Sequence, residues 1–230
     1  MADLRNMVPR KLRPILKRWK RAPQRKLDNL FFERLIGKTG NFACTWLGEP
    51  MLQNILDLWT IQETIFKVSP TLLIETGTYQ GGSAYFYACL FDLMGKGHVL
   101  TIDAEKRRDL SHPRIEFLQG SSVSDAVVAT AKERVLTARG PVMVILDSDH
   151  SERHVFGELE TYGPLVTPGS FLLVQDGVVD TLPRFRPLRP GPLPAIERFL
   201  KTHPEFEVDR ERCERFLITH HPLGWLRRKP

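Results

Sequence analysis

Short apolar runs that each end at an acidic residue recur along the chain. The runs and the acids that follow them are residues 71–74 with Glu75, 98–102 with Asp103, 142–146 with Asp147, and 171–174 with Gln175-Asp176. Uninterrupted apolar runs of this length are typical of strands in a parallel sheet that is covered on both faces. The carboxyl ends of such strands share one edge of the sheet, where ligands bind. The pattern therefore predicts four carboxylates around one crevice, with cations, sugar hydroxyl groups or a metal ion as their partners.

The segments between these runs predict helices. The predicted helices are residues 27–69, 83–94, 125–138, 151–162 and 195–201, and further strands are predicted at 114–119, 206–208 and 213–219. Ser151 is a favourable N-cap for the helix that follows it. Strands that alternate with helices through short loops predict an α/β fold with a Rossmann-like, doubly wound and mostly parallel sheet.

A proline-rich segment, residues 183–194, follows the run that ends at Asp176. A long connection without secondary structure of its own is typical of a lid or a binding loop. We therefore expect this segment to arch over the crevice as a lid loop.

The length and charge distribution predict one large domain with a basic tail. The 230 residues fit a single α/β domain, which we assign to residues 27–230. Of the net charge of +6, +9 belongs to residues 1–26, which leaves −3 for the remainder. Val8, Leu12, Ile15, Leu16 and Trp19 would share one face of a helix, as in a segment that lies on a membrane surface.

Two prolines, Pro9 and Pro14, interrupt that helix. We interpret residues 1–26 first as a solvated tail and next as a contact to an anionic membrane surface or a glycolipid, and we expect no nucleic-acid partner. No apolar run has the roughly 20 residues needed to cross a bilayer, and no secretory signal precedes the domain. With three scattered cysteines and no CxxC motif, the chain is expected in the reducing cytoplasm. The oligomeric state stays open between a monomer and a homo-oligomer.

A glycine-rich turn follows the first strand and reads Glu75-Thr-Gly77-Thr78-Tyr-Gln-Gly81-Gly82-Ser83. Glycines at a strand-to-helix turn let the backbone approach a ligand closely. The spacing is not the GxGxxG of pyrophosphate sites. A more open turn suits a ligand without phosphates, such as S-adenosylmethionine, whose cationic groups a nearby acid would help to hold. The alternative is a turn with solvated strand-end acids and no ligand.

Asp103 ends the next strand, where it could accept hydrogen bonds from both hydroxyl groups of a ribose. We assign Glu75, Gly77, Thr78, Gly81, Gly82 and Ser83 to the methionine part of the cofactor, Asp103 to the ribose, and Ser121 and Ser122 to the adenine side. Asp103 could equally hold the ribose of a nicotinamide cofactor. A nicotinamide-dependent oxidoreductase is therefore the enzyme alternative, although the missing GxGxxG disfavours it.

Oxygen ligands gather at the last two strand ends. Asp147, Gln175 and Asp176 would suit a hard dication, Mg²⁺ or Mn²⁺. His150 lies just beyond Asp147, where a histidine could take a proton from a hydroxyl group near such an ion. His154 is interpreted as a packing or capping residue of the helix that begins there.

Several short motifs occur in a fixed order along the chain. They are Trp46-x-Gly48, Asp57-x-Trp59-x-x-Gln62-Glu63, Ile74-Glu75-Thr-Gly77-Thr with Gly81-Gly82-Ser83-Ala84, Leu146-Asp147-Ser-Asp149-His150-Ser151 with His154-Val155, Asp176, Gly191-Pro192-x-x-Ala195-Ile196, and Pro222-x-Gly224-Trp225-Leu226-x-Arg228. In this combination the sequence resembles the cephalosporin hydroxylase/rhamnosyl O-methyltransferase family from about residue 42 to 228.

The resemblance implies a class I S-adenosylmethionine-dependent O-methyltransferase that modifies sugar hydroxyl groups on glycolipids or glycosylated natural products. It further implies a divalent metal held by Asp147 and by an acidic pair at positions 175–176, with His150 as the general base. Gln175 departs from this pattern because an amide stands where an acid is expected. A degenerate member that binds a ligand or partner without turnover is therefore the second alternative. The sequence does not identify the acceptor molecule.

Overall fold

The computed structural model describes residues 26–27, 29–34, 38, 43–109 and 111–230. The chain falls into two units, residues 1–42 and residues 43–230. In the first unit, residues 29–34 are helical. Residues 1–25 lie outside the described residues. The division of the chain at residue 26 and the membrane contact of the basic tail therefore stay predictions.

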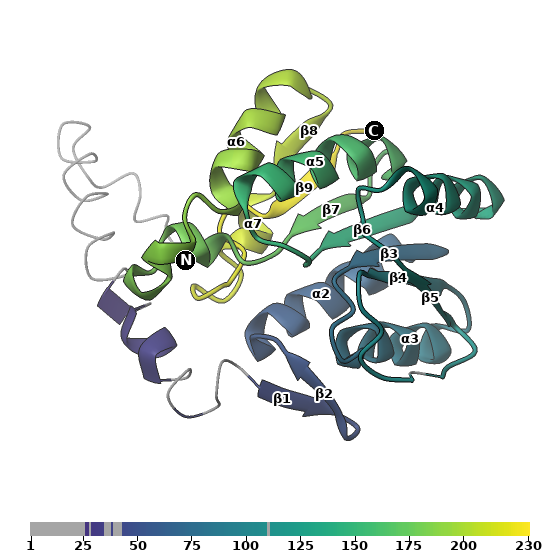
Figure 1. The fold of residues 1–230 in the computed structure, drawn as a ribbon, viewed down its shortest axis with the longest axis horizontal. Coiled ribbons are helices and arrows are strands. Elements are labelled where there is room, and N and C mark those ends of the chain that lie inside the picture. Colours follow the sequence, from purple (N-terminus) through teal and green to yellow (C-terminus); the bar gives the residue numbers. More distant parts are fainter. Residues whose placement is uncertain (1–25, 28, 35–37, 39–42, 110) are drawn as a thin grey trace, which may run out of the picture. The chain divides into compact units, whose positions relative to one another are not determined.

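A seven-stranded sheet forms the centre of the second unit, with the strand order β5-β4-β3-β6-β7-β9-β8 (Figure 1). The strands are β3 (Leu72–Thr76), β4 (His98–Asp103), β5 (Ile115–Gln119), β6 (Val142–Leu146), β7 (Phe171–Val174), β8 (Phe206–Val208) and β9 (Trp225–Arg228). The five strands from β3 to β7 pair in parallel, and β9 runs antiparallel to both β7 and β8. The predicted doubly wound, mostly parallel sheet is confirmed.

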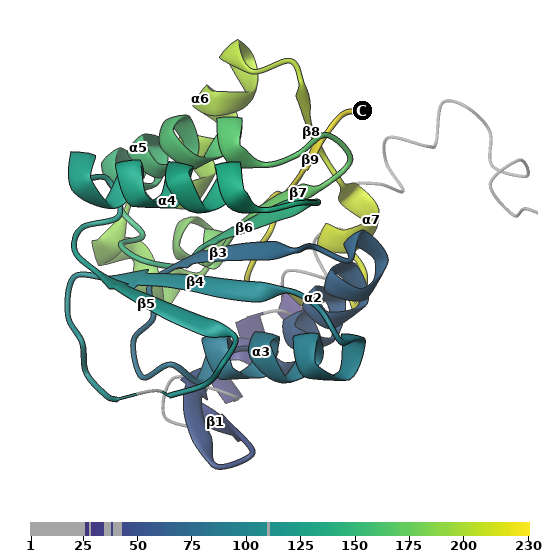
Figure 2. The same ribbon diagram turned by 90° about the vertical axis from the view of Figure 1, so that its right-hand side faces the viewer.

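Helices cover both faces of this sheet (Figure 2). They are α2 (Ile55–Val68), α3 (Gly82–Met94), α4 (Asp125–Thr137), α5 (Glu152–Tyr162), α6 (Pro192–Thr202) and the short α7 (Arg210–Cys213), with 3₁₀ turns η2 (Gly163–Leu165), η3 (Gly177–Asp180) and η4 (Pro183–Leu188). Side chains alternate across each strand, so Ile74 belongs to the core cluster that includes residues of α4, α5 and α6, while Leu73 belongs to the cluster that includes residues of α2 and α3. Burial on both faces explains why the strands read as unbroken apolar runs. None of the helices in the described part of the chain has the length and apolar character to span a bilayer.

The prediction of continuous helix over residues 27–69 is wrong between residues 43 and 52. These residues form a hairpin of β1 (Ala43–Trp46) and β2 (Glu49–Leu52). Leu47 and Gly48 both have positive φ, as a two-residue hairpin turn requires. The alternating exposure of β1 marks a strand with one covered face, a period-two signal that four residues carry only weakly.

The prediction of a strand at residues 213–219 is also wrong. Helix α7 begins after Asp209, whose side chain accepts a hydrogen bond from the Arg212 N–H, and no strand lies between α7 and β9. The closing strand is β9, which fills the gap between β7 and β8. Trp225 and Leu226 in β9 are fully buried, whereas Glu214 and Arg215 are exposed, and the burial of the two apolar side chains favours β9 as the strand.

The proline-rich segment has secondary structure of its own, contrary to the prediction of an unstructured loop. It contains η4 and the first turn of α6, and it is tied to η3. The carboxylate of Asp180 accepts hydrogen bonds from the N–H groups of Gly191 and Leu193, each at 2.8 Å. None of residues 183–194 lines the cavity described below, so their role as a lid stays a prediction.

Candidate active site

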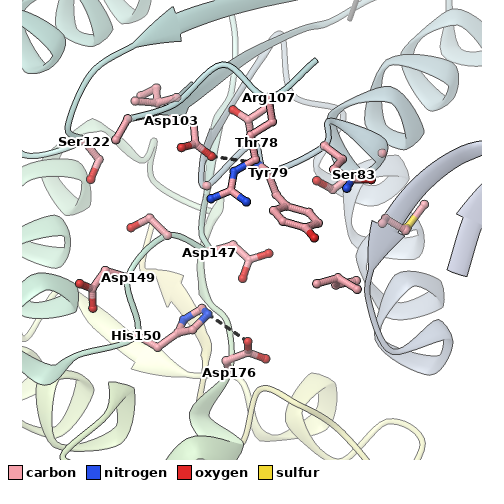
Figure 3. A pocket seen from close by; sticks show the side chains of 18 of the residues that line it. Thr78, Tyr79, Ser83, Asp103, Arg107, Ser122, Asp147, Asp149, His150 and Asp176 are labelled. Atoms are coloured by element: carbon pink, nitrogen blue, oxygen red, sulfur yellow. Dashed lines mark hydrogen bonds and ion pairs between the residues drawn. The ribbon is translucent and has the colours of Figure 1, made fainter. Parts of the chain in front are cut away.

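A cavity of about 510 Å³ lies at the carboxyl ends of the parallel strands (Figure 3). Its volume is in the range of small-molecule sites. Ten of the residues predicted to form a site line it: Gly77, Thr78, Gly82, Ser83, Asp103, Ser121, Ser122, Asp147, His150 and Asp176. Glu75, Gly81 and Gln175 do not line it. The structure thus brings together most of a site whose members are spread over a hundred residues of sequence.

Glu75 lies inside β3 and is completely buried. The Thr101 hydroxyl donates a hydrogen bond to Glu75 Oε2 at 2.6 Å. Burial raises the pKa of Glu75 to about 7, hydrogen bonds from Ser83 and Thr101 oppose the rise, and the Asp103 charge adds to it. Glu75 therefore lies behind the cavity, unlike the four acids that line it, Asp103, Asp147, Asp149 and Asp176.

The glycines of the turn after β3 serve the packing of the chain itself. Gly77 has a φ of +89°, and a Cβ there would overlap the carbonyl group of Asp147. A Cβ on Gly82 would overlap the carbonyl group of Pro50 on the hairpin. Gly81 caps α3 with a φ of 85°. These contacts differ from the predicted close approach to a ligand, although Gly77 and Gly82 do border the cavity.

Asp103 faces the cavity from the end of β4. Its carboxylate accepts hydrogen bonds from the Tyr79 N–H at 2.8 Å and from the Glu105 N–H at 3.0 Å. Two backbone donors hold the carboxylate in place, and each of its oxygens still has lone pairs for a ligand. The Arg107 guanidinium lies over the Tyr79 ring, 5.1 Å from its centroid, and both residues border the same part of the cavity.

Asp147, His150 and Asp176 form a compact group because β6 and β7 are neighbours. Their ligand atoms all lie within 4.8 Å of one another, and His150 Nε2 lies 3.1 Å from Asp176 Oδ2 (Figure 3). Burial and then the charge of Asp176 raise the pKa of Asp147 well above its usual range. Burial also acts to raise the pKa of Asp176, but the nearby histidines, His150 foremost, bring it below its usual range.

Two residues that sequence reasoning missed hold these carboxylates. Gln53 Nε2 donates to Asp147 Oδ2 at 2.9 Å, and His220 Nδ1 lies 3.4 Å from Asp176 Oδ1. The backbone N–H of His220 in turn donates a hydrogen bond to Oδ2 of Asp57, a residue of α2, at 2.8 Å. No local signal marks Gln53 or His220, because each meets its partner only through the tertiary fold.

The donor set of this group fits a divalent cation. Two carboxylates and an imidazole converge, and the mutual repulsion of the carboxylates would be relieved by a positive ion between them. Gln175 fits less well, because its side chain is buried outside the cavity lining. Its Nε2 has no hydrogen-bond partner among the described residues.

A second buried carboxylate, Glu158 on α5, connects three parts of the cavity wall. Its Oε1 accepts hydrogen bonds from Ser122 Oγ at 2.6 Å and Ser148 Oγ at 2.7 Å, and it lies 3.5 Å from His154 Nε2. The hydrogen bond with Glu158 raises the pKa of His154. His154 itself lines the cavity, which the sequence interpretation of a packing or capping residue did not include. The four-residue spacing of His154 and Glu158 on one helix could have predicted that the two side chains interact.

Comparison with known proteins shows the family to which this chain belongs. The sequence model of the family described as Rhamnosyl O-methyltransferase/CmcI matches residues 40–229. The chain belongs to the rhamnosyl O-methyltransferase/CmcI family. The family predicted from the sequence motifs is thereby confirmed, and residues 1–26 lie outside the matched range.

Two similar proteins with the name rhamnosyl O-methyltransferase come from mycobacteria. A rhamnosyl O-methyltransferase of Mycobacterium leprae is 34% identical over 202 residues, covering 83% of this chain and 86% of the relative. One from Mycobacterium tuberculosis is 33% identical over 188 residues, covering 79% and 77%. Among solved structures, CmcI with Mg and SAM superposes with a TM-score of 0.63 at 20% identity, covering 81% of this chain and 77% of that one. The predicted class I methyltransferase fold is confirmed.

Proposed function

We propose that this protein is an S-adenosylmethionine-dependent O-methyltransferase that acts on a hydroxyl group of a sugar, carried by a glycolipid or a glycosylated natural product. The observation that carries the proposal is the single cavity that Asp103, Asp147, His150 and Asp176 share, in a chain that belongs to the rhamnosyl O-methyltransferase/CmcI family. The mycobacterial relatives bear the name rhamnosyl O-methyltransferase, which supports a sugar as the acceptor.

The β4 side of the cavity suits the cofactor. Asp103 would accept hydrogen bonds from the ribose hydroxyl groups, and Ser121 and Ser122 would border the adenine. The turn from Gly77 to Ser83 would hold the methionine part. Two half-buried or buried carboxylates on this side, Asp103 and Glu75, supply negative charge near a ligand with a sulfonium and an ammonium group.

The β6 and β7 side suits the acceptor and a divalent ion. Asp147 and Asp176 would hold Mg²⁺ or Mn²⁺, with Gln175 as the weakest candidate ligand. When bound, such an ion lowers the pKa of a nearby hydroxyl group and neutralises developing negative charge.

His150 would remove the proton from the acceptor hydroxyl. Its Nε2 lies 3.1 Å from Asp176 Oδ2, so the ring lies beside the carboxylates that would hold the ion, where an acceptor hydroxyl group would bind. The hydroxyl oxygen would then take the methyl group of a bound S-adenosylmethionine, which would leave as S-adenosylhomocysteine. Holding these atoms in near-attack geometry supplies most of the acceleration.

Gln175 supports a second candidate, a degenerate family member that binds its ligands without turnover. An amide at this position removes one negative charge from the group at β6 and β7, and its side chain does not reach the cavity. Weaker metal binding is the expected consequence.

Transfer of a labelled methyl group tests the proposal. Purified protein incubated with Mg²⁺, trideuteromethyl-labelled S-adenosylmethionine and a panel of alkyl rhamnosides and glucosides should attach the label to a sugar hydroxyl, as read by mass spectrometry. The matched control is the same glycosides with every hydroxyl group already methylated, which should gain no label. A preparation that binds the cofactor but labels none of the glycosides would favour the degenerate member.

A further inference from the structure

Three buried side chains connect the interior of the sheet to the cavity. Glu75 on β3 and Thr101 on β4 are cross-strand neighbours and are both fully buried, and Thr78 lies in the turn after β3. Thr101 Oγ1 lies 2.6 Å from Glu75 Oε2 and 2.7 Å from Thr78 Oγ1. Only Thr78 of the three borders the cavity.

The chemistry of the three groups fixes the direction of this hydrogen-bonded chain. The Thr101 hydroxyl donates its single proton to Glu75 Oε2. Thr101 Oγ1 then accepts from Thr78, and the proton of Thr78 is committed to that bond. Thr78 Oγ1 can therefore offer only a lone pair to the cavity, so its partner in a ligand has to be a hydrogen-bond donor.

The charge of the chain points to a cationic donor. Glu75 makes no ion pair within the described residues, and its hydrogen-bond donors, the hydroxyl groups of Thr101 and Ser83, carry no charge. A buried carboxylate without an opposite charge is costly, so a cation bound close to it is favoured. The part of S-adenosylmethionine assigned to the neighbouring turn carries an ammonium group, which is a charged N–H donor.

We propose that Glu75 and Thr101 are positioning residues that orient the Thr78 hydroxyl as the acceptor for the ammonium group of the cofactor. The inference rests on the proposed function and deepens it. Glu75 acts on the ligand through two hydroxyl groups and through its charge. Thr101, which no sequence motif singled out, is the link that transmits its effect.

The test measures, by titration calorimetry at one pH, the affinity of the full-length wild type and of two variants for each of two ligands. The ligands are S-adenosylhomocysteine and its analogue that lacks the amino group. Thr101→Val keeps the shape of the side chain but breaks the chain of hydrogen bonds, and Thr101→Ser preserves it. The analogue serves as the internal control for folding, because it lacks the group that the chain is proposed to serve.

Thr101→Val should weaken S-adenosylhomocysteine about tenfold or more, the usual scale for a hydrogen bond to a charged group. The same variant should bind the analogue within about twofold of the wild type, and Thr101→Ser should bind both ligands as the wild type does. Equal weakening of both ligands by Thr101→Val, or no weakening of either, would overturn the inference while leaving the proposed function intact. A wild-type protein that bound neither ligand would overturn both.

Discussion

The His150→Ala variant is expected to lose about 10²- to 10⁴-fold in kcat while it binds S-adenosylhomocysteine as tightly as the wild type, the range typical of a general base. The reason is geometric. His150 lies with Asp147 and Asp176 at the β6 and β7 side of the cavity, away from Asp103, and its Nε2 is engaged by Asp176 at 3.1 Å. Removing the ring removes the proton acceptor and leaves the β4 side of the cavity unchanged.

The matched control for this variant is His98→Ala. His98 is an exposed histidine at the start of β4, at the opposite edge of the sheet. Its replacement should leave both kcat and cofactor affinity unchanged. A His150→Ala enzyme with a kcat within about twofold of the wild type would remove His150 from the role of base.

The second large effect is expected from Asp147→Asn, which should abolish turnover and weaken Mn²⁺ binding by more than the 10- to 100-fold that loss of an outer partner usually costs. Asp147 is one of only two carboxylates in the group that fits a metal ion. Because Gln175 is uncharged, Asp176 would be the only carboxylate left in the group to attract the ion after this substitution. Titration calorimetry with Mn²⁺ measures the affinity, and the rate of methyl transfer measures the turnover.

Three comparisons make this result specific. Asp149→Asn removes a charge from the same loop outside the group and should retain Mn²⁺ binding, since an Asn oxygen can still accept from the Ser151 N–H. Gln175→Glu should strengthen Mn²⁺ binding and raise turnover, and a rise from near zero would favour the degenerate member. Without metal, Asp147→Asn should unfold at a temperature no lower than the wild type, because the cost of burying the Asp147 charge and its repulsion from Asp176 are both gone. Unchanged Mn²⁺ affinity in Asp147→Asn would contradict the assignment of this ligand.

The central sheet and the convergence of its strand ends could be predicted from the sequence. The unbroken apolar runs indicated strands buried on both faces, and Asp103, Asp147 and Asp176 do line one cavity. The order of the strands in space brings together residues that the sequence separates, and the parallel-sheet rule is enough to anticipate that.

The prediction that the acid after each apolar run faces the cavity fails for Glu75. A position one residue further along a strand changes the face to which a side chain points. Strand β3 continues through Thr76, so Glu75 lies within the sheet and bonds to Thr101 instead of facing the cavity. Gln175, which directly follows β7, is also buried and does not line the cavity, whereas Asp176, in a left-handed conformation at the start of η3, does.

The supporting contacts could not be predicted. Gln53 and Asp147 are 94 residues apart in the sequence, and their hydrogen bond depends on a hairpin that the sequence interpretation took for helix. His220 lies beside Asp176 because its backbone N–H donates a hydrogen bond to Asp57, which is a residue of α2. Such contacts depend on the tertiary structure and leave no periodic signal in the sequence.

Titration calorimetry of the wild-type protein with S-adenosylhomocysteine and, separately, with NAD tests the central claim most directly, because it needs no knowledge of the acceptor. The account predicts saturable binding of S-adenosylhomocysteine, weakened in Asp103→Ala, and no binding of NAD. Saturable binding of NAD together with no binding of S-adenosylhomocysteine would contradict it.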